Sequence, residues 1–296
     1  MEIFNSSFTY DSKWLDATIA NMKKTYPFIS IGSIGNSVLG KPIHEIKIGK
    51  GTKKIHMNAS FHANEWITTM TLMSLLNSYL LSFKTESAIQ DFDAKFFYEN
   101  VELSVVPMVN PDGVDLVLNG PPLEYKEEIM KINNDSGDFI HWKANIRGVD
   151  LNKQFPAKWE AVKENGQAPD KPSLRDYPGN VPLSEPEAIA MANLVRNNHF
   201  DYILAFHTQG EEFYWGYEGF EPPESAIMAK RLEQVSGYKA IQYIDSHAGF
   251  KDWFIQEFKR PGFTIELGKG INPLPLSQFT KIVKSAEMLF LAALYL

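Results

Sequence analysis

A nearly continuous apolar run at residues 101 to 109, with the sequence VELSVVPMV, constrains the fold more than any other segment. Such a run is typical of a strand buried on both faces of a sheet, because a strand with one exposed face would alternate apolar and polar residues. The sequence NPDG follows at residues 110 to 113, and we interpret it as a turn. The run therefore predicts a central strand that is covered on both sides.

Segments with strand and helix patterns alternate along the rest of the chain. We predict further strands at residues 30 to 34, 43 to 48, 54 to 59, 201 to 206 and 262 to 267. We predict helices at residues 11 to 25, 66 to 83, 184 to 197, 225 to 236 and 276 to 294. Ser184 and Glu187 have the spacing of a capping box at the start of one of these helices. The alternation predicts an α/β fold with a mixed, mostly parallel central sheet flanked by helices.

Two stretches rich in Pro, Asn, Asp and charge, at residues 119 to 137 and 163 to 182, interrupt this pattern. We predict that they are long surface loops, of the kind that often borders a binding site. The length of 296 residues is compatible with one large domain, and we expect a single domain over residues 1 to 296.

The composition excludes several kinds of site and partner. The chain has no cysteine, so any metal must bind to His and carboxylate side chains. Its 29 Lys and Arg against 36 Asp and Glu give a net charge of −7, which disfavours nucleic acid and anionic membranes as partners. The N-terminal residues lack a signal-peptide pattern, and no run of about 18 apolar residues occurs. We therefore expect a cytoplasmic protein; no feature indicates an oligomeric state.

Three apolar segments carry side chains that can bind a metal or move a proton. His62 and Glu65 lie in the turn between a predicted strand and a predicted helix, His207 follows the strand pattern DYILAF, and Glu266 lies within FTIEL. Residues at the carboxyl ends of the strands in an open α/β sheet converge on one crevice, so we expect these four side chains to meet. A catalytic zinc takes three such ligands and leaves a fourth position for water.

A simpler interpretation of the first pair is an ordinary turn histidine and a first-turn carboxylate that faces the helix dipole. Two observations favour the metal site instead. No other histidine in the chain has a glutamate three residues later. In addition, Glu266 is costly to bury within an apolar strand unless it is paired, hydrated or functional.

The order and spacing of five motifs resemble the zinc carboxypeptidases of the carboxypeptidase A type. The motifs are HxxE at residues 62 to 65, NPDG at 110 to 113, GVDLN at 148 to 152, a histidine after an apolar strand at 207, and TxEL at 264 to 267. The resemblance implies that His62, Glu65 and His207 bind one Zn²⁺ per chain and that Glu266 is the general base. It also implies a peptidase that uses a zinc-activated water.

Two positions depart from the digestive members of this family. Asn152 and Lys153 stand where those enzymes have an Asn and an Arg that bind the terminal carboxylate of the substrate, so an ammonium replaces a guanidinium. Ile255 stands where they carry a mobile tyrosine. The specificity of the digestive enzymes is therefore not expected here.

The arginine that stabilises the oxyanion in this family has two candidate counterparts. Lys143 matches its position after a tryptophan, whereas Arg147 preserves the guanidinium. We prefer Arg147 as the catalytic residue and retain Lys143 as a substrate contact. For both residues the alternative is an ordinary surface charge on a loop.

The segments WKANIRGVDLNKQFPAKWE, FHTQGEEFYW and SHAGFKDWFI are similar to the bacterial γ-D-glutamyl-diamino acid peptidases of peptidoglycan metabolism. This similarity implies a muropeptide substrate in which γ-D-Glu is joined to diaminopimelate or Lys. The substrate contacts that we predict are Asn152, Lys153, Lys143, Gln209 and His247. Glu211 and Glu212 would suit the second charged centre of the diamino acid, or they form an exposed turn. His247 is alternatively an ordinary loop histidine.

Other functions are compatible with the same residues. A general metallocarboxypeptidase would remove C-terminal residues from ordinary peptides, and an N-acyl amino acid deacylase would act on small amides. The two long predicted loops favour a peptide-sized groove over the second of these. A non-catalytic zinc-binding module is disfavoured because metal binding alone would not require Glu266.

Overall fold

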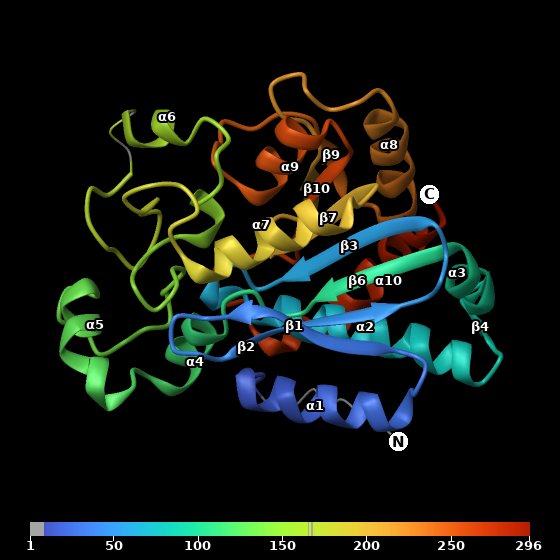
Figure 1. The fold of residues 1–296 in the computed structure, drawn as a ribbon, viewed down its shortest axis with the longest axis horizontal. Coiled ribbons are helices and arrows are strands. Elements are labelled where there is room, and N and C mark those ends of the chain that lie inside the picture. The colour runs from blue at the N-terminus through green and yellow to red at the C-terminus, as the bar shows by residue number, and fades with distance from the viewer. Residues whose placement is uncertain (1–8, 165, 167) are drawn as a thin grey trace.

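A mixed β-sheet runs through the centre of the computed structural model, which describes residues 9 to 164, 166 and 168 to 296 (Figure 1). Within these residues the strand order across the sheet is β1 (Ser30–Asn36), β2 (Pro42–Ile48), β6 (Val101–Val106), β3 (Lys53–Ala59), β7 (Tyr202–Thr208), β10 (Gly262–Leu267), β8 (Glu212–Tyr214) and β9 (Lys239–Ile241). The four strands from β6 to β10 are parallel, as are β8 and β9, and the other pairings are antiparallel. The predicted fold class is confirmed.

Helices cover both faces of this sheet. One face packs against α1 (Ser12–Thr25), α2 (Ile67–Lys84), α8 (Glu224–Ser236) and α10 (Phe279–Tyr295). The other face packs against α7 (Pro186–Asn198) and α9 (Phe250–Phe258). Figure 1 shows α7 and α1 on opposite sides of the sheet. Among the described helices, none combines the length and apolar character needed to cross a bilayer.

Shorter elements connect these layers. They are the 3-10 helices η1 (Ala63–Glu65), η2 (Leu123–Tyr125), η3 (Leu151–Lys153) and η4 (Leu276–Gln278), the hairpin β4 (Ala88–Ile89) and β5 (Phe92–Asp93), and the helices α3 (Ala94–Asn100), α4 (Pro111–Asn119), α5 (Lys126–Ile132) and α6 (Trp159–Glu164). The sequence patterns did not reveal the hairpin, β8, β9, α3 or α9. The first predicted loop contains η2 and α5, and the second begins at the end of α6.

Strand β7 illustrates why the central strands have apolar sequences. All seven of its residues are buried. Its successive side chains point to opposite faces, so that Leu204 and Phe206 join the core beneath α2 and α10, whereas Ile203 and Ala205 join the core beneath α7 and α9. With apolar layers on both sides, neither set of side chains can be polar until the strand ends.

The interpretation of NPDG as a turn is wrong. The strand β6 ends at Val106, before a proline that has no N–H to donate to the sheet. Helix α4 then begins at Pro111, and Asn110 caps it by accepting a hydrogen bond from the Gly113 N–H at 3.0 Å. A Cβ at Gly113 would lie 2.6 Å from the Asn110 side chain, so the cap requires glycine there. The motif is a helix start.

The predicted capping box is also wrong, although the helix that follows it is present. Helix α7 begins at Pro186, and Glu185 is its N-cap without a capping side chain. The Ser184 hydroxyl donates to Gln154 Oε1 at 3.1 Å. Glu187 Oε1 accepts from the Val38 N–H at 3.1 Å, far along the chain. Both side chains bind other segments, because tertiary partners displaced the local pairing.

Candidate active site

Three neighbouring parallel strands bring the predicted metal-binding side chains together. His62 follows β3 and is the N-cap of η1, and Glu65 ends that short helix. His207 lies near the end of β7, and Glu266 on β10 is its direct neighbour in the register of the sheet. Because the carboxyl ends of parallel strands share one edge, all four side chains lie beside one another.

The donor atoms of three residues converge on one point. His62 Nδ1 lies 2.9 Å from Glu65 Oε1, His207 Nδ1 lies 3.0 Å from Glu65 Oε2, and the two Nδ1 atoms are 3.1 Å apart. All three residues are buried. Ligands bound tetrahedrally at the usual zinc distances are about 3.4 Å apart, close to the observed separations. Two imidazole nitrogens that face each other with a carboxylate form a site that fits a cation.

Further side chains hold these three in place. His62 Nε2 lies 3.3 Å from Asp150 Oδ1, and Asn272 Nδ2 donates to Glu65 Oε1 at 3.2 Å. Thr208 Oγ1 in turn donates to Asn272 Oδ1 at 2.7 Å. A carboxylate or amide behind a ligand fixes its orientation and raises its basicity. Sequence reasoning assigned no role to Asp150 or Asn272, although the GVDLN motif contains the first.

The charges of this cluster shift the ionisation of its members. Burial opposes the charged form of Glu65, but His62 and His207 outweigh it and hold the pKa of this carboxyl below its usual range. Burial also opposes the charged form of His62, yet the carboxylate of Glu65 raises the pKa of the imidazole. For His207, burial lowers the pKa. The site thus favours a carboxylate in contact with cationic charge.

Glu266 differs from Glu65 although both are carboxyl groups of the same cluster. Burial raises the pKa of Glu266 well above its usual range, and the nearby carboxylate of Glu65 adds to this effect. No hydrogen bond or ion pair to its carboxyl group is recorded within the described part of the chain. A carboxyl group with a raised proton affinity that remains free of partners is suited to accept a proton.

A cavity of about 360 Å³ opens above these side chains. Its lining residues are His62, Asn64, Glu65, His141, Lys143, Arg175, Thr208, Gln209, Tyr214, Glu266, Ile271 and Asn272. Of the predicted substrate contacts, Lys143 and Gln209 line it. The residues that sequence reasoning missed come mainly from irregular segments, for which periodicity carries no information.

The two candidates for the oxyanion group have different positions, and only Lys143 lines the cavity. The Lys143 ammonium lies 2.8 Å from Asp150 Oδ2 and 2.9 Å from Asp176 Oδ1, and its side chain is 17% exposed. Burial lowers the pKa of Lys143, but Asp150 and Asp176 outweigh it, so the pKa lies above its usual range. The main-chain carbonyl of Lys143 accepts the Ala63 N–H at 3.0 Å, which places this residue beside His62.

Arg147, the preferred candidate from the sequence, is not among the residues that line this cavity. Its side chain is 55% exposed, and Nη1 lies 3.5 Å from Glu185 Oε2. The physical reason is a tight turn in which Asn145 Oδ1 accepts the N–H groups of Arg147 and Val149, at 3.0 and 3.1 Å. The Arg147 side chain that follows this turn is largely exposed, whereas Lys143 lines the cavity.

Three further predicted contacts form a neighbouring cluster outside the cavity lining. Asn152 Oδ1 accepts the Phe250 N–H at 2.9 Å, and Lys153 Nζ lies 3.4 Å from the main-chain oxygen of His247. His247 Nδ1 lies 3.2 Å from the Tyr217 hydroxyl. The contacts of Asn152 and Lys153 connect η3 to the start of α9 and the residues just before it.

The position where digestive members carry a mobile tyrosine has a structural role here. Ile255 lies in α9 and is fully buried in the core beneath that helix. It therefore makes no contribution to the cavity.

Comparisons with known proteins agree with this geometry. The zinc carboxypeptidase family model matches residues 15 to 288. Over 99% of this chain and 74% of its own length, a Lysinibacillus sphaericus protein named gamma-D-glutamyl-L-diamino acid endopeptidase 1 is 52% identical. The uncharacterized Bacillus subtilis protein YqgT is 49% identical over 97% of this chain and 77% of its own length.

A solved structure shows the same fold. Bovine thrombin-activatable fibrinolysis inhibitor, in complex with tick carboxypeptidase inhibitor, matches 98% of this chain and 97% of its own with a TM-score of 0.75 and 20% identity. Zinc is the metal of the matching family, and the cluster of His62, Glu65 and His207 has the donor set that zinc prefers. The chain belongs to the zinc carboxypeptidase family and is a zinc metallopeptidase.

Proposed function

We propose that this peptidase hydrolyses the bond between γ-D-Glu and a diamino acid, diaminopimelate or Lys, in peptidoglycan stem peptides. The main observation that supports hydrolysis is the convergence of His62, Glu65 and His207 beside Glu266. The relative that is 52% identical and named for this bond supports the substrate. The polar lining of the cavity also suits a substrate with several charged groups.

We propose that His62 and His207, through Nδ1, and Glu65, through its carboxylate, hold the zinc. Bound zinc would polarise the scissile carbonyl and make a water acidic enough to act near neutral pH. Asp150 and Asn272 orient two of these ligands from behind. The chain thereby fixes the donor atoms before the substrate enters.

Glu266 is the proton carrier in this proposal. Its carboxylate takes a proton from the attacking water as oxygen bonds to the carbonyl carbon, and delivers that proton to the leaving amine nitrogen as the C–N bond breaks. Its position next to His207 in the sheet places it beside the metal-binding side chains, where both steps take place. The products are a free γ-carboxyl group on D-Glu and a free amino group on the diamino acid.

Lys143 takes the oxyanion role that was first assigned to Arg147. Its ammonium has three N–H donors, and Asp150 and Asp176 occupy two of them. Among the described residues the third has no recorded partner, so it can face the cavity that Lys143 lines. Negative charge that develops on the carbonyl oxygen would be stabilised by this fixed cation.

Mass spectrometry of digested substrates tests this function. L-Ala-γ-D-Glu-diaminopimelate and its Lys analogue are incubated with the zinc-loaded protein, in parallel with α-linked peptides that have ordinary C-termini. We expect cleavage after γ-D-Glu alone and its loss with a chelator. Trimming of the α-linked peptides would favour the metallocarboxypeptidase alternative, hydrolysis of N-acyl amino acids alone would favour the deacylase, and zinc binding without any hydrolysis would favour the non-catalytic module.

Two expectations from the sequence accompany this proposal. The eight-stranded sheet contains β1 from the first part of the chain and β10 from its last part. This continuity supports a single zinc peptidase domain over residues 1 to 296. Limited proteolysis is expected to leave one resistant core. The cytoplasmic location stays a prediction, which fractionation of the cells tests directly.

A further inference from the structure

Two side chains of β8 lie next to Glu266 and have no role in the steps above. Glu212 is directly opposite Glu266 in the antiparallel pairing of β8 with β10, so both point to the same face of the sheet. Tyr214, two residues later, points to that face too and lines the cavity. Its hydroxyl donates to Glu212 Oε1 at 2.6 Å.

Gly210 makes room for this arrangement. A Cβ at Gly210 would lie 2.7 Å from Glu212 Cγ and 3.0 Å from Glu266 Cβ. The two glutamates therefore stand side by side above the glycine, and a larger residue would push them apart. The neighbouring hydroxyl of Tyr214 holds one oxygen of Glu212 and leaves its second oxygen available.

The charge of Glu212 is uncompensated, in contrast with that of its neighbour in sequence. Glu211 points outward, where Lys281 lies 2.7 Å and Lys269 lies 3.2 Å from its carboxylate oxygens. For Glu212, no Lys, Arg or His nitrogen among the described residues is recorded within ion-pair distance of the carboxylate. An unpaired carboxylate next to two residues of the cavity lining favours a ligand that brings its own positive charge.

The opposite sign of charge comes from another part of the cavity lining. Lys143 and Arg175 line the cavity from irregular segments, whereas Tyr214 and Glu266 line it from the sheet. Glu212 is in contact with Tyr214 and lies opposite Glu266. A substrate with an ammonium and carboxylates can therefore pair each group with its opposite. This complementarity matches the stem-peptide substrate, since its diamino acid carries an ammonium and its D-Glu carries a free carboxylate.

We propose that Glu212, oriented by Tyr214, binds the side-chain ammonium of the diamino acid and so determines the specificity for that residue. The inference rests on the proposed function. The diamino acid is the leaving group, and Glu266 delivers the proton to its amine. Glu212 stands beside Glu266 on the adjacent strand, within reach of the side chain that extends from this leaving group.

The test compares L-Ala-γ-D-Glu-L-Lys with L-Ala-γ-D-Glu-L-norleucine, which differ in the ammonium group. We expect the unmodified protein to prefer the Lys peptide in kcat/KM. Glu212→Gln keeps the shape and the acceptor for Tyr214 but removes the charge, so kcat/KM for the Lys peptide is expected to fall about 10- to 100-fold. For the norleucine peptide, the fall in kcat/KM is expected to be much smaller. The preference for the Lys peptide over the norleucine peptide is therefore expected to disappear, mainly because KM for the Lys peptide rises.

Two variants complete the design. Glu211→Gln removes the neighbouring surface carboxylate and should leave the preference for Lys intact. Tyr214→Phe removes the hydrogen bond that orients Glu212 and should weaken the preference partly. Norleucine turnover by each variant shows that the fold and the zinc site remain.

Each other outcome has a definite meaning. Equal losses of Glu212→Gln on both peptides, or a retained preference, would overturn the inference and leave the proposed function standing. Equal cleavage of both peptides by the unmodified protein would also overturn the inference and leave the proposed function standing. Failure of the zinc-loaded protein to cleave either γ-D-Glu peptide would overturn the proposed function itself, and the inference with it.

Discussion

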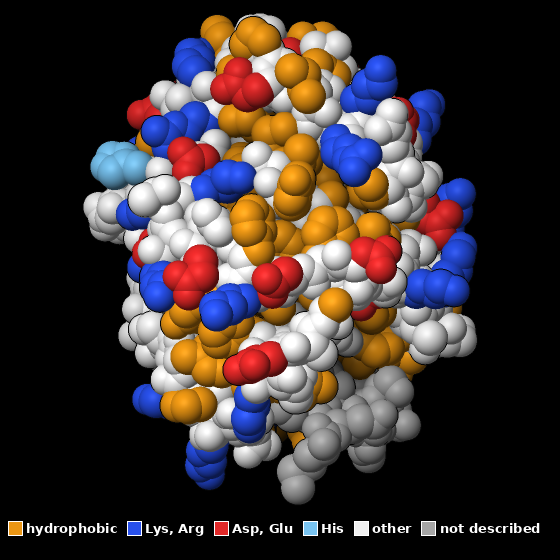
Figure 2. Space-filling view, turned by 90° about the vertical axis from the view of Figure 1, so that its right-hand side faces the viewer, with side chains coloured by type: hydrophobic (Ala, Val, Ile, Leu, Met, Phe, Trp, Pro, Cys, Tyr) orange, Lys and Arg blue, Asp and Glu red, His pale blue; other side chains and the backbone are white. Residues whose placement is uncertain are grey.

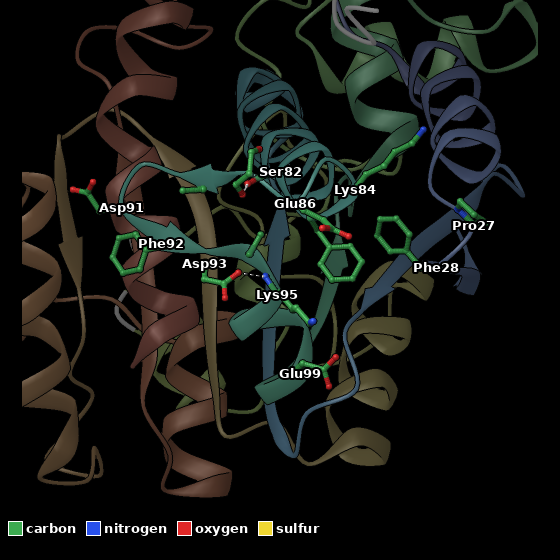
Figure 3. A pocket seen from close by; sticks show the side chains of 14 residues that line it. Pro27, Phe28, Ser82, Lys84, Glu86, Asp91, Phe92, Asp93, Lys95 and Glu99 are labelled. Atoms are coloured by element: carbon green, nitrogen blue, oxygen red, sulfur yellow. Dashed lines mark hydrogen bonds between the residues drawn. The ribbon is translucent and has the colours of Figure 1, made fainter.

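Two cavities lie at opposite ends of the central sheet, and the larger one is not the one that contains the metal-binding cluster. The cavity at the carboxyl ends of the strands has a volume of about 360 Å³, whereas the cavity between the β4–β5 hairpin, the end of α2 and α3 has about 780 Å³. Figure 3 shows the second, which we call the distal cavity, with Phe28, Phe92 and charged side chains around it. α3 and the hairpin lie at the right of Figure 1, and Figure 2 shows that side with hydrophobic side chains exposed between charged ones.

The two regions differ in how their polar groups are partnered. Around the distal cavity Phe83 stacks on Tyr98 with ring centroids 4.3 Å apart, Lys50 pairs with Glu99 at 3.0 Å, and Asp93 caps α3. These groups satisfy one another. In the active-site cavity, the donor atoms of two imidazoles and a carboxylate converge on one point instead. Converging donor atoms therefore indicate the position of the active site better than the volume of a cavity does.

The largest expected contrast comes from Glu266, the proposed general base. Glu266→Gln should lower kcat by about 10²- to 10⁴-fold, because an amide cannot take the proton from water. Zinc content, measured by metal analysis, should stay at one per chain. The matched change at the distal cavity, Glu99→Gln, should leave kcat unchanged. A nearly normal rate for Glu266→Gln would remove it from the base role.

The next contrast concerns the cation at each cavity. Lys143→Met should lower kcat by about 10²- to 10³-fold with a smaller change in KM, since oxyanion stabilisation acts in the transition state. Lys143→Arg should recover part of the rate. Lys50→Met removes an exposed lysine beside the distal cavity and should have no effect on steady-state kinetics. An unchanged kcat for Lys143→Met, in a protein that still binds zinc, would assign the oxyanion to another group.

A smaller effect is expected from the carboxylate behind His62. Asp150→Asn should weaken zinc binding by about 10- to 100-fold, because it removes the charge that orients the imidazole and raises its basicity. Competition with a chelator of known affinity measures this change. Asp93→Asn retains a side chain that can cap α3 and serves as the control. Equal zinc affinity in both variants would show that Asp150 serves stability only.

The smallest effect on catalysis is expected where the distal cavity is enlarged. Phe83→Ala removes a half-buried ring that packs on Phe28 and Tyr98, and should lower the free energy of unfolding by roughly 1 to 3 kcal/mol. Denaturant titration measures this loss. The value of kcat/KM for the stem peptide should not change below the unfolding transition. A large fall in kcat/KM would show that the two cavities are coupled.

Much of the site was predictable because it lies on regular elements. Tyr202–Thr208 and Gly262–Leu267 are recognisable as strands from their apolar residues, and the direction of parallel strands brings their carboxyl ends to one edge. This is why His207 and Glu266 could be expected to meet. The NPDG motif was recognised as important and assigned the wrong structure, since a capped helix start and a turn use the same residue types.

The sequence by itself determined the class of fold, the donor residues and their order along the chain, because strand and helix periodicities and motif spacings are local properties. Only the tertiary structure decided which cation faces the cavity and which glutamate is free. Lys143 and Arg147 are only four residues apart in the sequence. Glu211 pairs with Lys269 and Lys281, which are far away along the chain, so no local pattern reveals these ion pairs. Those choices depend on the turn made by Asn145 and on the pairing of β8 with β10. Contacts between distant segments set them, and periodicity does not encode such contacts.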